Sequence, residues 1–312
     1  MKWFGTAQKE PGWLVIALSE SRMSFVHGRH AATGRSAIAR FGSAEFEGKP
    51  GAAEKLAKEL RFDRYQCATL LRPGEYQMLM VEAPTVPQAE LKSAIRWRIK
   101  DMLDYHVDDA TVDVLDIPPE SSQAGRNHSM FAVAARNEVI QERVKTFESA
   151  RIPLTAIDVP EIAQRNISAL HETEGRGAAL LYFNDEFGLL TITCGGELYF
   201  ARRIEIGLKQ ILGAGAEARE ELFGRVVLEL QRTFDHFDRQ YQHVPVAKVL
   251  LGPERDETGL YAHLKSNLDV PVERVDLLER LSFNGQGAPD TVAQWQLFHL
   301  IGASLRHETK AL

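Results

Sequence analysis

The chain has 312 residues, of which 44% are hydrophobic and 26% charged, and its formal net charge is −6. This length and composition predict a globular protein of two or three structural units with a sizeable hydrophobic core. The acidic balance, without a basic stripe, argues against nucleic acid as a partner. The N-terminal stretch "MKWFGTAQKEPGW" lacks the apolar core of a signal peptide, and no apolar run approaches the ~18 residues that cross a bilayer. We therefore expect a cytoplasmic protein without membrane insertion of its own.

Residues 1–65 have the pattern of three strands followed by a helix. The strands are predicted at "WLVIALSE" (13–20), "MSFVHGRH" (23–30) and "SAIARFG" (36–42). In "PGAAEKLAKELRF" (50–62), three apolar residues fall on one face of a helix: Ala52, Leu56 and Leu60. The pattern predicts one α/β layer.

Residues 66–150 have the pattern of a separate small α+β unit. Two strands surround the turn Arg72-Pro73-Gly74, because Pro-Gly is a strong turn signal. Two further strands are predicted at 111–118 and 128–135, with the loop "ESSQAGRN" (120–127) between them, and helices at 87–104 and 137–150. A small sheet with two helices on one face would account for this segment.

Residues 176–289 repeat the first pattern in outline. Three strands are predicted within 177–207, with Gly195-Gly196 as a hairpin turn. A long helix over 216–242 follows, because apolar residues recur there every three or four positions. A buried strand (246–252), a helix (259–268), a closing strand (270–278) and a last helix (291–308) complete the chain. The last helix is expected to return to the first unit. Two similar α/β halves that face each other, separated by an inserted module, are the predicted architecture.

Four segments in sequence resemble a known family. They are "AIRWRIKDMLDYHVDDATVDV" (94–114), "LYFARRIEIG" (198–207), "LELQRTFDHFDRQY" (228–241) and "FHLIGASLRHE" (298–308). In their order and spacing, over residues 13–308, the chain resembles the PilM group of actin-like cytoplasmic proteins of type IV pilus assembly. Within that group it is most similar to the MshI proteins of the mannose-sensitive haemagglutinin (MSHA) pilus.

The resemblance implies an α/β, actin-like (ribonuclease H-like) duplicated fold with an inserted small α+β domain. Residues 1–65 would form the first actin-like subdomain, completed by about 151–175 and by a C-terminal helix within 290–312. Residues 66–150 would be the inserted domain and 176–289 the second actin-like domain. In such a fold a nucleotide lies in the cleft between the halves, where two hairpin turns each offer an acid and a glycine to the phosphates.

The sequence departs from this nucleotide-binding pattern at both turns. In the first turn, Ala17 stands where the family pattern has the acid and Ser19 where it has the glycine. In the second turn, Tyr182 stands at the acid position and Asn184 at the glycine position. In the adenosine-side turn "LLGPERDE" (250–257) only Gly252 is kept. Charged hydrogen bonds contribute about 1.5–3 kcal/mol each, so losing two acids and two glycines would lower nucleotide affinity by orders of magnitude. We therefore expect neither an enzyme nor a bound cofactor.

An ATP- and Mg²⁺-binding switch is the alternative. Asp185, next to the second turn, would supply the acid if the alignment were shifted. The glycines Gly213 and Gly215 of "LGAGAE", expected after a strand and before the long helix, would adjoin the cleft but lack a complete phosphate-loop pattern.

The resemblance also implies a partner. In the family, the inserted domain and the first subdomain form a groove that accepts the N-terminal cytoplasmic peptide of a PilN-like, single-pass inner-membrane protein. That partner would hold the chain at the inner membrane and couple it, indirectly, to the pilus assembly ATPase. A homo-oligomer is compatible with the sequence.

Trp97 is the residue that the sequence most strongly suggests for this groove. At 100° per residue it lies away from the apolar stripe of its helix, flanked by Arg96, Lys100 and Asp101. Trp and Arg often carry interface energy, and Met78 and Met80 on a nearby strand would supply an adaptable apolar floor. The alternative is that Trp97 packs against a neighbouring domain of the same chain.

The remaining titratable residues suggest no further site. His27 and His30 have no third ligand at metal spacing, and Cys67 and Cys194 are expected as free thiols in a reducing compartment. Arg202 and Arg203 alternate with isoleucines on a strand, so at least one points away from the core, and a salt bridge is expected there.

Overall fold

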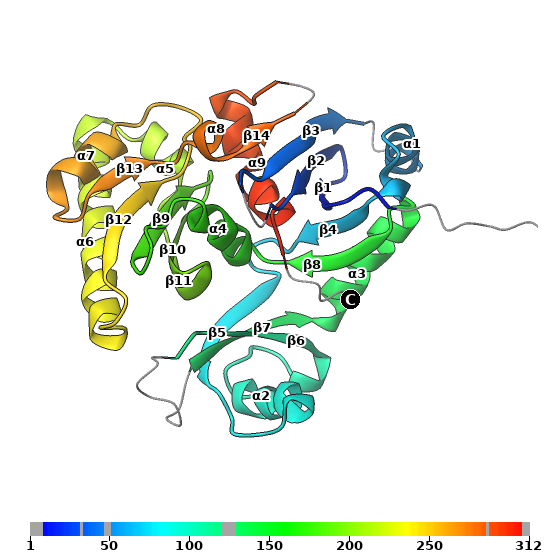
Figure 1. The fold of residues 1–312 in the computed structure, drawn as a ribbon, viewed down its shortest axis with the longest axis horizontal. Helices are drawn as coiled ribbons and strands as arrows, with labels where there is room; N and C mark the ends of the chain where they lie inside the picture. Colours follow the sequence, from blue (N-terminus) through cyan, green and yellow to red (C-terminus); the bar gives the residue numbers. More distant parts are fainter. Residues whose placement is uncertain (1–8, 32–33, 47–50, 120–128, 285–286, 308–312) are drawn as a thin grey trace, which may run out of the picture.

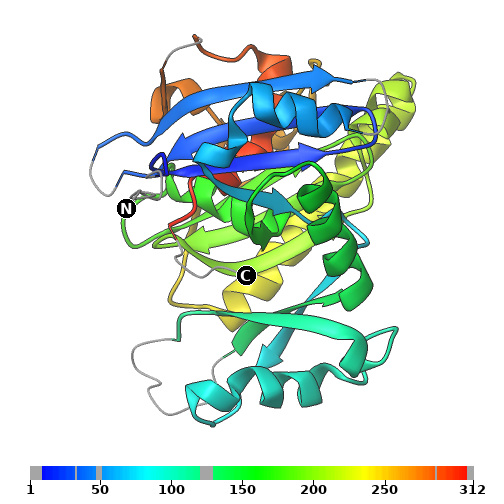
Figure 2. The same ribbon diagram turned by 90° about the vertical axis from the view of Figure 1, so that its right-hand side faces the viewer.

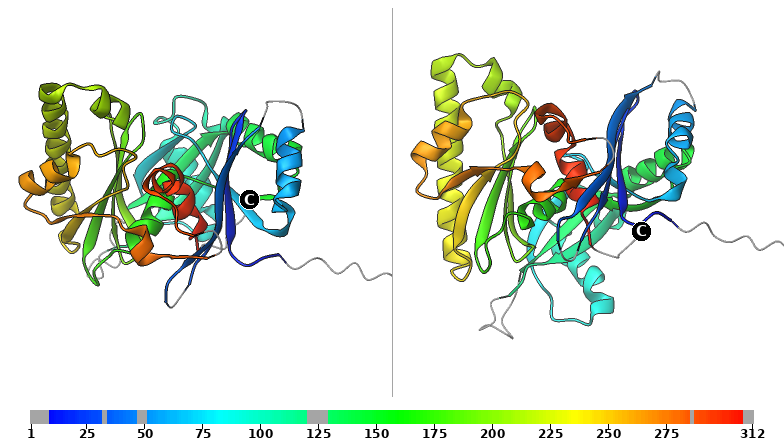
Figure 3. Two further views of the ribbon diagram at one scale, coloured as in Figure 1. Left: turned by 90° about the horizontal axis from the view of Figure 1, so that it is seen from above. Right: turned by 45° about the horizontal axis from the view of Figure 1, so that its top comes forward.

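The computed structural model describes residues 9–31, 34–46, 51–119, 129–284 and 287–307. It consists of alternating layers of helix and sheet, with a small domain projecting from one end (Figures 1 and 2). Seen from above, two sheets lie side by side with a pair of helices between them and further helices on their outer faces (Figure 3). The two halves are those expected from the repeated sequence pattern.

The first half is built on a six-stranded sheet. Its order is β14 (Ser282–Phe283), β3 (Ala37–Glu45), β2 (Arg22–Arg29), β1 (Trp13–Leu18), β4 (Gln66–Leu70) and β8 (Leu154–Asp158). Strand β1 alternates, so that Leu14 and Ile16 meet the outer helices whereas Val15 meets the inner ones. Those outer helices are α1 (Ala52–Glu59) and α3 (Asn137–Ser149). The 3-10 turn Phe62–Arg64 lies between α1 and β4.

The second half is built on a five-stranded sheet. Its order is β11 (Glu197–Ile204), β10 (Gly188–Cys194), β9 (Gly177–Phe183), β12 (Val246–Leu251) and β13 (Val272–Arg274). Its outer face is covered by α6 (Ala216–Gln240) and α7 (Leu260–Asn267), and the short helices are α5 (Leu208–Gly213) and α8 (Leu277–Arg280). Gly195 and Gly196 both have positive φ in the β10–β11 hairpin, as the sequence predicted.

The inserted domain is a three-stranded sheet, β5 (Tyr76–Glu82), β7 (Ser129–Arg136) and β6 (Ala110–Asp116). Helix α2 (Leu91–Ile99), preceded by a 3-10 turn at Gln88–Glu90, covers one face through Ile95 and Ile99. The opposite face packs against the core of the second half. A further 3-10 turn, Val107–Asp109, precedes β6.

Two helices lie between the sheets and hold the halves together. Helix α9 (Thr291–Ser304) packs on β1 and β2, as the sequence predicted for the last helix, and α4 (Pro160–Ala169) packs on β9 and β10. The two helices touch closely, since a Cβ at Gly302 would lie 2.1 Å from the carbonyl oxygen of Ala163. The middle layer therefore depends on a residue without a side chain at this crossing.

Several predicted boundaries differ from the structure because sheet partners are distant in sequence. Strand β4 pairs in parallel with β1 and β8, so the inserted sheet begins at β5 rather than at residue 66. Helix α3 packs on the first sheet, so the insertion ends with β7 and carries one helix, not two. Strand β14, expected in the second half, pairs with β3.

Three smaller expectations also differ. The helix expected at 87–104 is shorter, and the closing strand keeps only three residues before α8 begins. Gly213 is the last residue of α5 and Gly215 directly precedes α6, so neither follows a strand. The helix predicted at 291–308 ends at Ser304; its residue 308 and the loop predicted at 120–127 lie outside the described residues.

Among the described helices, none combines the length and apolar character needed to cross a bilayer.

Gly302→Ala should destabilise the protein by about 3 kcal/mol, because its methyl group would overlap the α4 backbone. Gly224→Ala in α6 is the matched control, since a Cβ there meets nothing within 4 Å. That change should add up to about 1 kcal/mol of helix stability. Urea unfolding followed by circular dichroism measures both, and equal stabilities for the two variants would contradict the close packing of α4 and α9.

Candidate functional site

Two hollows between parts of the fold are candidate sites. The first, the interlobe cleft, lies between the halves and has a volume of about 520 Å³. It is lined by Arg22, Ser24, Tyr182, Asn184, Asp185, Glu186, Lys209, Arg255, Trp295 and Gln296. The second, the α3 groove, lies where α3 and the β4–β5 turn face the β1–β2 turn and the start of α1, and it measures about 550 Å³.

The aromatic residue Tyr182 occupies the cleft position at which the actin-like nucleotide-binding pattern has an acid. The Tyr182 ring stacks on Phe298 with the centroids 4.5 Å apart, and its hydroxyl donates to the Trp295 carbonyl at 2.8 Å. Burial raises the pKa of Tyr182. Gly252 lies directly behind this ring, because a Cβ there would be 3.0 Å from it. The Trp295 indole in turn donates to the Phe183 carbonyl at 2.8 Å, which ties α9 to β9.

The backbone donors of the second turn are already used within it. The Asn184 side-chain oxygen accepts from the N–H groups of Glu186 (2.8 Å) and Phe187 (2.9 Å). Asp185 forms ion pairs with Arg255 at 3.0 Å and with Lys209 at 3.9 Å. A phosphate cradle needs free, converging N–H groups and a carboxylate for the metal. In this turn, the Asn184 side chain already accepts from two of the N–H groups. The Asp185 carboxylate already pairs with two cations.

The Ser19 side chain is used within the first turn, and the glycines of "LGAGAE" lie outside the cleft lining. The Ser19 hydroxyl accepts from the Arg22 N–H at 3.0 Å and donates to the Arg22 carbonyl at 3.1 Å, while Ala17 lies exposed on β1. Gly213 and Gly215 are not among the residues that line the cleft. Among the described residues, no group of three or more His, Cys, Asp and Glu is placed to hold a metal.

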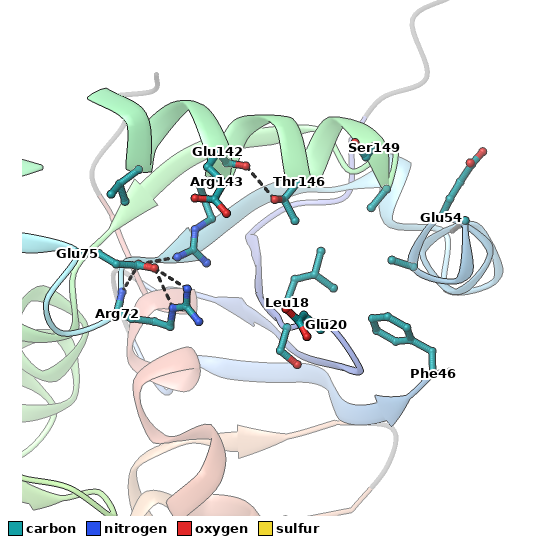
Figure 4. A pocket seen from close by; sticks show the side chains of 15 residues that line it. Leu18, Glu20, Phe46, Glu54, Arg72, Glu75, Glu142, Arg143, Thr146 and Ser149 are labelled. Carbon is teal, nitrogen blue, oxygen red and sulfur yellow. Dashed lines mark hydrogen bonds and ion pairs between the residues drawn. The ribbon is translucent and has the colours of Figure 1, made fainter. Parts of the chain in front are cut away.

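The α3 groove combines an apolar middle with a charged end (Figure 4). Leu18 and Phe46 line the side formed by the first subdomain, and Val139 lies on the facing helix α3. Around them are carboxylates from three separate elements, Glu20, Glu54 and Glu142; that of Glu54 pairs with Arg151 at 2.9 Å. Ser19, Gly51, Ala53, Arg72, Glu75, Arg143, Thr146, Ser149 and Ala150 complete the lining.

Two guanidinium groups converge on one carboxylate at the charged end. Glu75 accepts from the Arg72 backbone N–H at 2.7 Å, from its Nε at 2.8 Å, and from Arg143 at 2.5 Å. Burial by itself would raise the pKa of Glu75, but the Arg72 hydrogen bonds and the Arg143 charge outweigh it and lower the pKa. The Arg143 side chain is 10% exposed and that of Arg72 is 73% exposed. This end of the groove therefore carries net positive charge and donors that solvent can reach.

The structure separates the residues that were predicted to form one partner site. Trp97 and Lys100 line a third hollow, formed by α2 and the loop after it, and not the α3 groove. Arg96 donates to the carbonyls of Ala110 (2.7 Å) and Val107 (2.6 Å), so it holds that loop. Asp101 lines the same hollow.

The two methionines lie on the other side of the inserted sheet. Met78 and Met80 pack against the second half, and the Met80 sulfur accepts from the Gln240 amide at 3.5 Å. The prediction of a single site that contains both Trp97 and these methionines is therefore wrong, because the inserted sheet lies between them. The alternative that Trp97 packs against a neighbouring domain is also wrong, since its side chain is 71% exposed.

Sequence reasoning missed the charged end of the groove. Arg143 and Glu75 are 68 positions apart, so no local pattern joins them. The Pro-Gly turn was identified, and an acid three positions after Arg72 was the available signal. The salt bridge expected at Arg202 and Arg203 is confirmed, because Arg202 pairs with Glu229 at 2.6 Å; Arg203 lies over the Tyr76 ring.

Comparison with known proteins identifies the fold. No protein-family model matches the sequence, and no curated protein sequence matches it. Among solved structures, the chain is similar to one of the PilM–PilN type IV pilus biogenesis complex, with a TM-score of 0.71 and 18% identity over 94% of this chain and 97% of that chain.

Two weaker similarities have 11% identity. The cytoplasmic domain of EpsL, an inner membrane component of the type II secretion system of Vibrio cholerae, gives a TM-score of 0.48 over 96% of each chain. A Bacteroides thetaiotaomicron protein with an actin-like ATPase fold gives 0.45, over 96% of this chain and 99% of that one. The fold is the duplicated actin-like α/β fold that the sequence predicted.

Glu75→Gln should lower the free energy of unfolding by about 2 kcal/mol near neutral pH, because it removes a largely buried charged acceptor from two arginines. The folded-state pKa of Glu75 lies below its ordinary value of 4.5. Its contribution is therefore complete above that value and is lost as the pH falls through the folded-state pKa. Urea unfolding of both proteins from neutral to acid pH should show the difference shrinking.

Glu82→Gln, at the end of strand β5, is the control. Its carboxylate is 43% exposed and pairs with Arg98 at 3.4 Å, so the change should cost less than about 0.5 kcal/mol. A pH-independent difference for Glu75→Gln would contradict the ionised cluster.

Proposed function

We propose that this chain is a PilM-like, non-enzymatic scaffold of a type IV pilus assembly machine, and that the machine is of the MSHA type. The observation that carries the proposal is the full-length likeness of the fold to a chain of the PilM–PilN complex. The MSHA assignment is supported by the four sequence segments described above. In this proposal the protein works on the cytoplasmic face of the inner membrane, where a PilN-like partner holds it and links it to the assembly ATPase.

We place the partner's N-terminal peptide in the α3 groove. The groove lies between the first subdomain and the turn that enters the inserted domain, and it offers apolar contacts at Leu18, Phe46 and Val139. Exposed donors of Arg72 at its end suit peptide carbonyls or a carboxylate, because guanidinium groups form strong, directional hydrogen bonds. An apolar hollow with a few polar groups at one end is typical of a peptide site.

The cleft supports the non-enzymatic part of the proposal. The Tyr182 ring fills the position of the acid of the second turn, and the Asn184 side chain accepts from two backbone N–H groups of that turn. The alternative, an ATP-dependent switch, would need Asp185 to leave Arg255 and Lys209 and bind Mg²⁺. We favour the scaffold, because Arg255 and Lys209 already form ion pairs with that carboxylate.

Thr146→Arg should weaken peptide binding at least about tenfold, because an exposed side chain in the groove wall becomes long and charged. The probe is a fluorescein-labelled peptide that copies the cytoplasmic N-terminus of the organism's own PilN-like protein, followed by fluorescence anisotropy. Gln141→Arg is the control, since it makes the same charge change at an exposed position of α3 outside the groove. Equal weakening by both variants, or no binding by the parent protein, would contradict the peptide site.

Calorimetric titration with Mg-ATP should give no saturable heat at concentrations high enough to detect a Kd of about 1 mM. The reason is that Asn184 already accepts from two N–H groups of the turn and that Arg255 and Lys209 already pair with its carboxylate. Binding in the micromolar range that Asp185→Asn abolishes would instead establish the switch.

A further inference from the structure

The hollow around Trp97 is separate from the α3 groove and from the interlobe cleft. We name it the Trp97 surface; it is formed by the outer face of α2 and the loop that leads to β6, and its volume is about 770 Å³. Every residue that lines it belongs to the inserted domain, and it shares none with the α3 groove or the cleft. Helix α2 lies at the free end of the molecule (Figures 1 and 2).

The loop of the Trp97 surface is held in place without using the indole. Arg96 donates to two loop carbonyls, and Arg136 stacks 4.2 Å from the Tyr105 ring while pairing with Asp104 at 3.3 Å. Trp97 itself is the most exposed of the large hydrophobic side chains that the structure describes, at 71%. Its ring contributes little to the stability of the fold, because a side chain so exposed buries little apolar area.

The residues that line the Trp97 surface carry more acidic than basic groups. They include Asp101, Asp104 and Asp108 against Arg96 and Lys100, a formal net charge of −1. The lysine, Lys100, lies with its amine 5.3 Å from the Trp97 ring, so the indole face already accepts a cation. Asp104 pairs with Arg136 and Asp108 lies 3.5 Å from His106, whereas Asp101 has no ion-pair or hydrogen-bond partner among the described residues.

We propose that the Trp97 surface docks a basic, arginine-bearing segment of a second protein. An arginine can replace Lys100 on the indole, because guanidinium stacks on aromatic faces better than ammonium does. The free carboxylate of Asp101 and the negative field around it favour a cationic partner and give electrostatic complementarity. Tryptophan is also the residue most typical of an interface anchor.

The carboxylate of Asp101 disfavours two other occupants of an exposed tryptophan. Anionic lipid and nucleic acid would each bring phosphates close to this unpaired negative charge. The Trp97 surface shares no residue with the α3 groove. This chain would therefore bridge two partners when one is bound at each place. The inference stands independently of the groove, since neither site needs the other.

The test uses the full chain and a short amphipathic peptide whose polar face carries arginines, with fluorescence anisotropy as the readout. A second peptide with glutamates in place of the arginines is the matched probe. The parent protein should bind the arginine peptide saturably and not the glutamate peptide. Trp97→Ala should weaken binding about tenfold or more, Trp97→Phe by less, and Asp101→Lys should also weaken it.

Two controls separate this surface from non-specific attraction to an acidic protein. Leu228→Ala removes an exposed apolar side chain (43% exposed) from α6 and should leave binding unchanged. Thr146→Arg, in the α3 groove, should also leave it unchanged, so failure of the groove proposal and failure of this one are distinguishable. An unchanged Kd for Trp97→Ala with unaltered thermal unfolding, or no saturable binding by the parent protein, would overturn the proposal.

Discussion

The crossing of α4 and α9 between the two sheets is the constraint on which the rest of the structure depends. Gly302 lets the helix backbones meet, and the Asn166 amide donates to its carbonyl at 3.0 Å. On the other side, Gln164 donates to the carbonyls of Leu180 (2.7 Å) and Leu189 (3.0 Å) in the second sheet. One layer is thus fixed to both halves, so their relative placement follows from it.

This middle layer also forms part of the wall of the interlobe cleft. Side chains from α9 and β9 line it, where Tyr182 stacks on Phe298 and the Trp295 indole donates to the Phe183 carbonyl. The α3 groove, on the far side of the first sheet, keeps free apolar surface and exposed donors. In the function proposed above, ligands therefore bind at the outer surfaces rather than in the cleft.

Elements with long, regular patterns were predicted well, and the assignment of elements to sheets was not. The periodicity of 216–242 closely matches α6, and Gly195-Gly196 closes a hairpin as expected. In contrast, β4 and α3 were assigned to the inserted domain because they are adjacent to it in sequence. A strand's own residues specify which side chains are buried, but its pairing partner is set by the packing of remote segments.

The sequence by itself determined the duplicated α/β architecture and the position of Trp97 outside the apolar stripe of its helix. Only the tertiary structure decided that this indole stays exposed, and that Arg143 meets Glu75 from 68 positions away. The physical reason is that helical and strand periods fix the direction of a side chain relative to its own element. What the side chain then meets depends on contacts between distant elements, which periodicity does not encode.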